Sequence, residues 1–146
     1  MIVATTRFGS LSVEPEDVIS FPDGLIGLPS LSRSVLLADS ANAIVAWLQS
    51  LTVPGCAVAV VHPRRFVPGY QVRVAPSELS PLGLHSPSDA SVLVVVGQSN
   101  GNMTLNLKAP LVLNLHAGLG RQVITENAYP LRYVIVPDRP RLRRSA

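Results

Sequence analysis

The sequence predicts an all-β protein: a single antiparallel, barrel-like domain of short strands with at most one short helix. Thirteen prolines and ten glycines divide its 146 residues into short apolar runs. Many of these runs are rich in β-branched residues, which favour strands. The runs follow one another too closely for helices to alternate with strands. A sheet of many short strands is expected to close into a barrel, because closure removes exposed edges.

Each apolar run is expected to form one strand. Continuous apolar runs at 57–61 and 92–96 indicate strands that are buried on both faces. The alternating run at 70–75 indicates a strand with one wet face. The expected strands, in chain order, are 2–8, 17–21, 33–38, 44–51, 57–62, 70–75, 91–97, 102–108, 111–116, 121–125 and 131–136.

Turn residues separate these runs. Ala117-Gly118-Leu119-Gly120 is predicted to be a four-residue hairpin loop, and Pro54-Gly55 to lie at the centre of a turn. The helix is expected from Pro76 to about Leu82, where Ser77 is a candidate cap and Pro81 interrupts the pattern.

The chain length and composition predict one folded domain, residues 1–137, followed by a basic, disordered tail, residues 138–146. With 47% hydrophobic and 14% charged residues, the chain as a whole is not of the disordered class. No apolar run reaches the ~20 residues that span a bilayer, and no basic region precedes the first apolar residues. We therefore expect a cytoplasmic protein that does not enter a membrane.

The positive net charge belongs to the tail. Residues 1–137 contain eight cations and eight anions, so the body is neutral, and the net charge of +3 comes from four tail arginines against Asp138. This distribution gives no sign of a folded basic face.

The residues that most often carry chemistry are isolated in this sequence. His62, His85 and His116 lack companions at metal-ligand spacing, and Cys56 has no nearby base or cation. The glycines at 118–120 lack the third glycine and the helix of a phosphate loop. We expect no enzyme activity, cofactor, metal or small-molecule substrate.

Several polar residues interrupt apolar runs, and each allows two interpretations. Asn106 and Asn114 either pin the turn around Pro110 or line a groove that accepts another chain. Trp47, with Gln49 beside it, is either a core anchor or an interface residue. The acidic cluster at 14–17 is either a solvated loop or a patch for a basic partner.

Three segments, in their order and spacing, resemble the FliW family of flagellar assembly factors. They are Phe21-Pro22-Asp23-Gly24-Leu25-Ile26-Gly27, Trp47-Leu48-Gln49-Ser50-Leu51 and Met103-Thr104-Leu105-Asn106-Leu107-Lys108-Ala109-Pro110-Leu111-Val112-Leu113-Asn114. The similarity runs from about residue 6 to residue 136.

The resemblance implies a non-catalytic binding protein with two protein partners. It would bind flagellin as a chaperone, and it would bind the translational regulator CsrA when flagellin has left, which relieves repression of flagellin translation. The residues expected to contact these partners are Phe21, Asp23, Leu25, Trp47, Gln49, Asn106, Lys108, Pro110 and Asn114.

The alternative function is that of a small β-barrel that binds RNA through its arginine-rich tail. The neutral body and the absence of an aromatic row on one strand argue against it. No direct contact with nucleic acid is therefore expected.

Overall fold

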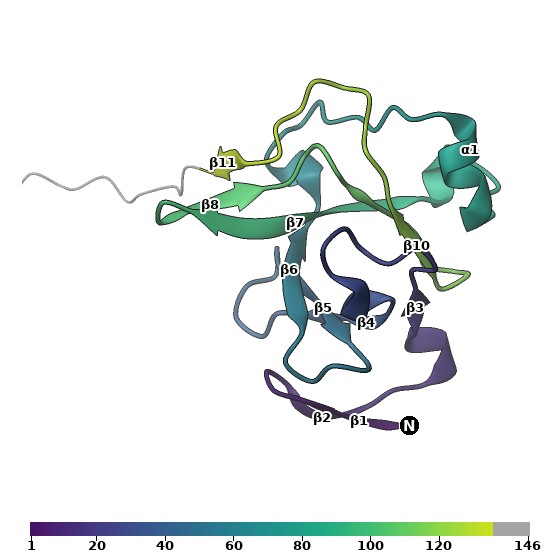
Figure 1. The fold of residues 1–146 in the computed structure, drawn as a ribbon, viewed down its shortest axis with the longest axis vertical. Coiled ribbons are helices and arrows are strands. Elements are labelled where there is room, and N and C mark those ends of the chain that lie inside the picture. Colours follow the sequence, from purple (N-terminus) through teal and green to yellow (C-terminus); the bar gives the residue numbers. More distant parts are fainter. Residues whose placement is uncertain (136–146) are drawn as a thin grey trace, which may run out of the picture.

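Seven strands close into a barrel in the computed structural model, which describes residues 1–135 (Figure 1). The strands of the described residues are β1 Ile2–Thr5, β2 Gly9–Ser12, β3 Ile19–Ser20, β4 Arg33–Ala38, β5 Ala46–Ser50, β6 Ala57–Val61, β7 Ser91–Ser99, β8 Asn102–Leu105, β9 Leu111–Asn114, β10 Leu119–Gln122 and β11 Tyr133–Ile135. The expected all-β, barrel-like class is confirmed.

The barrel runs in the order β3, β4, β5, β6, β7, β9 and β10, and β10 returns to β3. Its pairings are antiparallel except between β10 and β3, which are parallel and meet at a single pair, Leu119 with Ser20. Phe21, which follows β3, packs against Gly120 of β10, where an added Cβ atom would lie only 2.4 Å from the Phe21 ring. The barrel therefore closes through side-chain packing as well as through hydrogen bonds.

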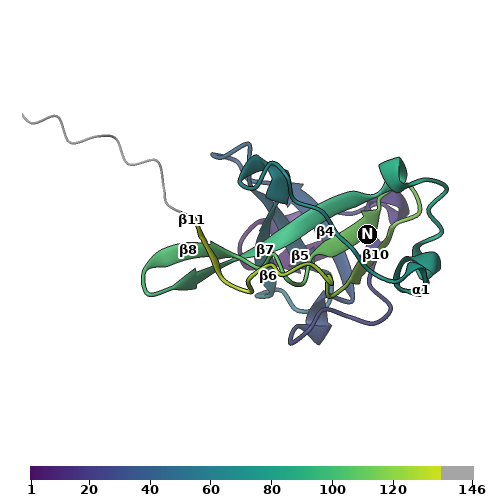
Figure 2. The ribbon, with the colours of Figure 1, turned by 90° about the horizontal axis from the view of Figure 1, so that it is seen from above.

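Strand β7 belongs to two sheets at once. Residues 91–95 pair with β6 and β9 in the barrel, whereas residues 96–99 pair with β8. Strand β11 pairs with the outer edge of β8. The β7–β8–β11 part projects from the barrel on the side opposite α1 (Figures 1 and 2).

Two large apolar clusters fill the interior. The barrel cluster includes Phe21, Leu31, Leu48 and Leu111, all fully buried. The second cluster lies where β7 leaves the barrel and includes Tyr70, whose hydroxyl donates a hydrogen bond of 2.6 Å to the carbonyl oxygen of Leu107. Burial, and then the neighbouring Tyr129, raise the pKa of Tyr70, so this hydroxyl stays a donor.

The expected helix is present as α1, Pro76–Leu79, which continues as a 3₁₀ turn over Ser80–Leu82. Pro76 occupies its first turn, where a missing N–H costs nothing. The residue before it, Ala75, takes the cap position without a side-chain hydrogen bond, so Ser77 is not the cap.

Several strand predictions need correction. The runs 102–108 and 111–116, for example, end at Leu105 and Asn114. The run 2–8 ends at Thr5, because the Thr5 hydroxyl bonds with Phe8 and Gly9 and turns the chain into β2. The run 17–21 retains only the two residues of β3. Residues 70–75 are not assigned to a strand.

A further correction concerns the loop before β10. The expected strand 121–125 begins at Leu119, so the hairpin loop ends at Gly118, which has a φ of +67°. Glycine adopts this conformation without the steric cost that a side chain would bring. The loop therefore comprises residues 115–118, two residues earlier than the expected 117–120.

No helix among residues 1–135 is long and apolar enough to cross a bilayer. The tail 138–146 and the end of the expected strand 131–136 lie outside the described residues, so the domain boundary at residue 137 stays a prediction.

Candidate partner-binding surfaces

The polar residues around Pro110 bind the protein's own backbone. Asn106 accepts a hydrogen bond from the Ala109 amide at 3.0 Å. Asn114, which is buried, donates to the Leu82 carbonyl at 2.8 Å and accepts from the Ala117 amide at 3.2 Å. These contacts match the first of the two interpretations of the amides, in which they pin turns.

The Lys108 ammonium group also binds the backbone of its own chain. Its Nζ atom donates to the carbonyl oxygens of Thr125 and Asn127 at 2.7 and 2.9 Å. Pro110 itself is buried, and its carbonyl accepts from the Val123 amide. Oδ1 of Asn106, Nζ of Lys108 and both amide atoms of Asn114 thus bind the protein's own backbone, while Asn106 and Lys108 are only half-buried. Partner contacts at these residues stay a prediction.

Three further predicted contact residues lie in the interior. Phe21 and Gln49 have exposed fractions of 0%, and that of Leu25 is 5%. The Gln49 amide donates to the carbonyls of Ser50 and Pro54, while its Oε1 atom has no partner among the described residues. A folded protein cannot offer these side chains to a partner, so their assignment as contacts is corrected to a structural role.

Asp23 is an exposed residue of the turn that follows β3. Its carboxylate lies 3.4 Å from Nε of Arg121, and the same guanidinium lies 3.6 Å from the Glu78 carboxylate and donates to the Glu78 carbonyl at 2.9 Å. Arg121 therefore ties the turn and α1 to β10. Asp23 remains accessible at the surface.

Trp47 lies half-buried at the centre of a surface cluster on β5. Its indole N–H donates to Asp39 at 2.9 Å, the Arg7 guanidinium lies 3.9 Å from the centre of the ring, and Phe8 packs edge-on at 6.3 Å. The hydrogen bond from Trp47, followed by those from the Ala41 and Asn42 amides, lowers the pKa of the Asp39 carboxyl. Tryptophan and arginine are the residues most enriched in interface hot spots.

An acidic hollow of about 360 Å³ lies beside β2 and β4. Its lining residues with charge are Glu16 and Asp17, and its walls include Leu11, Leu37 and the exposed Leu115. Asp17 accepts a hydrogen bond from the Glu14 amide, which holds the 3₁₀ turn Pro15–Asp17 in place. An apolar hollow with carboxylates at its rim suits a basic partner.

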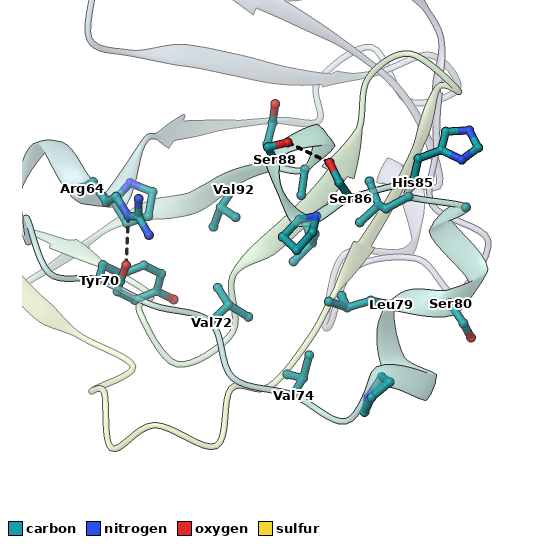
Figure 3. A pocket seen from close by; sticks show the side chains of 18 of the residues that line it. Arg64, Tyr70, Val72, Val74, Leu79, Ser80, His85, Ser86, Ser88 and Val92 are labelled. Atoms are coloured by element: carbon teal, nitrogen blue, oxygen red, sulfur yellow. Dashed lines mark hydrogen bonds between the residues drawn. The ribbon is translucent and has the colours of Figure 1, made fainter.

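A larger groove, of about 1070 Å³, lies between β7, α1 and the segment 62–75 (Figure 3). Its lining is mostly apolar, including Val72, Val74, Leu79 and Val92. Sequence reasoning missed this site, because its residues are spread over 62–92 and Val112 and share no motif. The alternation at 70–75 was the available signal, since it marked a half-exposed extended segment.

The histidines do not form a site with carboxylates or with Cys56. Among residues 1–135 there is no group of three or more His, Cys, Asp or Glu side chains placed to hold a metal ion. Cys56 is half-buried and lies 3.0 Å from the Ser30 hydroxyl.

Comparison with known proteins gives a consistent result. The family model described as "FliW protein" matches residues 2–135. The flagellar assembly factor FliW of Bdellovibrio bacteriovorus is 36% identical over 87% of this chain and 74% of that protein. The one of Moorella thermoacetica is 34% identical over 94% of this chain and 90% of that protein.

A solved structure agrees with these relatives. The crystal structure of the flagellar assembly factor FliW superposes with a TM-score of 0.84 and 26% identity, over 96% of this chain and 100% of that one. With the family model covering nearly the whole described barrel, the chain belongs to the FliW family.

Proposed function

We propose that this protein is a flagellar assembly factor that acts by binding and not by catalysis. It binds flagellin as a chaperone, and it binds the translational regulator CsrA, which relieves the repression of flagellin translation. The observation that carries this proposal is the family match over residues 2–135, together with relatives that are named flagellar assembly factors.

Two surfaces support a role in protein binding. The Trp47 cluster combines a half-buried indole with a guanidinium and a carboxylate, and it lies on a strand that is rigidly paired on both sides. The acidic hollow joins exposed carboxylates to apolar walls. We assign CsrA to the acidic hollow, because a regulator that binds RNA carries a basic surface.

Competition between the partners follows from this mechanism. If one molecule holds flagellin or CsrA but not both, the free concentrations and the two affinities set how much CsrA remains active. Each tenfold difference in affinity corresponds to about 1.4 kcal/mol. No chemical step is needed for the response.

The direct test uses purified flagellin and CsrA from the same bacterium. We expect each to bind the full-length protein, and flagellin to displace CsrA in a titration. If neither binds at micromolar concentrations, the proposal is wrong. Salt-sensitive binding of RNA in the same assay, with no protein partner, would support the alternative RNA-binding function instead.

A charge reversal tests the acidic hollow. Glu16 is exposed and its side chain makes no hydrogen bond or ion pair among the described residues. Glu16→Lys is expected to slow association with CsrA about tenfold at low salt and to leave stability unchanged. The matched control is Glu126→Lys, since Glu126 is also exposed and lies outside both hollows. Equal rates for the two variants would remove the hollow from the CsrA surface.

A further inference from the structure

Residues 70–75 form hydrogen bonds with their neighbours along one edge. The Gln71 amide donates to the Tyr129 hydroxyl at 3.1 Å and the Arg73 amide to the Thr125 hydroxyl at 3.0 Å. The Arg73 carbonyl accepts from the Glu126 amide at 2.7 Å. The odd-numbered residues of this segment are thus fixed to residues 125–129.

The even-numbered residues face the other way. Successive N–H groups of an extended chain point in opposite directions, so those of Val72 and Val74 point away from residues 125–129. Neither residue has a backbone hydrogen bond among residues 1–135. Their side chains line the large groove, as Figure 3 shows. The segment therefore offers one unpaired strand edge beside an apolar groove.

The groove has a distinct charge as well as an apolar lining. Its charged or titratable lining residues are Arg64, His62 and His85, with Tyr70 buried at one end, and no carboxylate is among them. Arg64 and His85 lie at opposite ends (Figure 3). Arg64 makes no ion pair with the described residues. Such a groove favours an anionic occupant.

The groove is held in shape before anything binds. Nε of Arg64 donates to the Tyr70 carbonyl at 3.0 Å, which leaves its other guanidinium N–H groups for a ligand. The Tyr70 hydroxyl is fixed to the Leu107 carbonyl, and its ring packs on Tyr129 at 4.6 Å. Because these groups are already ordered, binding costs less conformational entropy.

We propose that this groove binds an extended segment of another protein, which adds as a strand along residues 71–75. Its backbone pairs with the N–H and C=O groups of Val72 and Val74, alternate apolar side chains fill the groove, and a carboxylate of the segment pairs with Arg64. Addition of a strand to an open edge is a common way to bind peptides, with side-chain pockets supplying specificity.

This inference goes beyond the proposed partners and stands whether or not they bind. The chain's own tail fits the groove poorly, because its four arginines would face the Arg64 guanidinium and would find no carboxylate in the lining. A second copy of the chain is the other occupant that the test must separate.

The test begins with a displayed library of nine-residue peptides that have apolar residues at alternate positions and random residues between them. Selection on the full-length protein is expected to enrich peptides with glutamate or aspartate over those with lysine or arginine. Selection on Arg64→Glu should reverse that preference. Arg65→Glu is the matched control, since Arg65 is exposed on the same turn but does not line the groove.

Amide hydrogen exchange then locates the selected peptide. At about nine times its dissociation constant, nine-tenths of the protein is bound, so exchange at Val72 and Val74 is expected to slow about tenfold. The Arg73 amide, already bonded to Thr125, is the internal control and should change little. A second check uses peptides N-methylated on alternate residues, of which one set should lose binding and the other keep it.

Four results would overturn the proposal. These are a library that yields no acidic binders, or a bound peptide that leaves exchange at Val72 and Val74 unchanged. The other two concern slow exchange of the Val72 and Val74 amides without added peptide. If removal of residues 137–146 abolishes this slow exchange, the tail is the occupant. If the exchange slows further as the protein concentration rises, a second copy of the chain is the occupant.

Discussion

At the scale of single residues, the side chains that look unusual in the sequence mostly serve the fold. Amides are disfavoured in strands, yet Asn106 and Asn114 each supply a hydrogen bond where the backbone turns away from its strand ladder. A buried amide is costly only when it has no partner. The presence of an asparagine in the sequence does not show whether its hydrogen-bond partner lies in the same chain or in another protein.

Asn114→Ala is therefore expected to destabilise the protein while leaving its binding intact. The substitution leaves the Leu82 carbonyl and the Ala117 amide without their partner, at a cost of about 1–3 kcal/mol in the free energy of unfolding. Urea unfolding measures this loss, with Asn102→Ala on the exposed part of β8 as the control. Weakened partner binding by a fully folded Asn114→Ala would contradict the structural role.

Asp39 makes stability depend on pH. Its pKa is lowered from the ordinary 3.8, mainly by the hydrogen bond from Trp47. A lowered folded-state pKa adds stability that is present above the unfolded pKa and is lost as the pH falls through the folded one. We expect the stability difference between the protein and Asp39→Asn to be present at pH 7 and to shrink below about pH 4. Unfolding curves at both pH values would test this, and a constant difference would contradict it.

At the scale of elements, a local sequence pattern shows which face of a segment is exposed, but it does not show which segments pair with it. The alternation at 70–75 correctly indicated one wet face, since Gln71 and Arg73 are exposed and Val72 and Val74 are half-buried. The segment is still not a strand of the sheet, because the Gln71 and Arg73 amides donate to the side chains of Tyr129 and Thr125, and only the Glu126 amide pairs with it backbone to backbone. Pairing of this kind depends on distant residues that no local window contains.

The same limit explains the candidate sites. The sequence pointed to residues within recognisable runs, and Phe21, Leu25 and Gln49 turned out to be buried. Most of the groove lining comes from residues 62–92, between β6 and β7 and at the start of β7. Prolines and serines interrupt the apolar residues there, so the lining residues do not form a recognisable motif. Exposure and proximity, which define a surface, arise only when the elements pack.

The seam between β3 and β10 offers a prediction at this scale. Because the strands share a single backbone pair, their contact depends on Phe21 lying directly on Gly120. Gly120→Ala would place a Cβ atom 2.4 Å from the Phe21 ring and 2.7 Å from Leu113, and overpacking of this kind costs about 1–3 kcal/mol. Urea unfolding measures it, with Gly69→Ala, which meets no atom within 4 Å, as the control. Equal free energies of unfolding for Gly120→Ala and Gly69→Ala would contradict this prediction and show that Phe21 and Leu113 shift to accommodate the methyl group.

At the scale of the whole molecule, a neutral body conceals two hollows of opposite character. The acidic hollow carries Glu16 and Asp17, whereas the large groove carries Arg64 and two histidines, and the two share no lining residue. Counting charges along the sequence could not separate them, because they cancel within the body. The molecule can therefore present different surfaces to acidic and to basic partners without any net charge.

The arginine-rich tail is expected to be dispensable for folding. The four apolar clusters of the described residues are formed between Val3 and Ile135, and residues 138–146 add little beyond Leu142 that could be buried. Truncation after Val136 should change the melting temperature by less than about 2 °C. A full-length variant with the four tail arginines replaced by glutamine separates charge from length. If truncation lowers the melting temperature by many degrees and the glutamine variant does not, the tail packs against the body through its apolar atoms; if both do, its charges stabilise the fold.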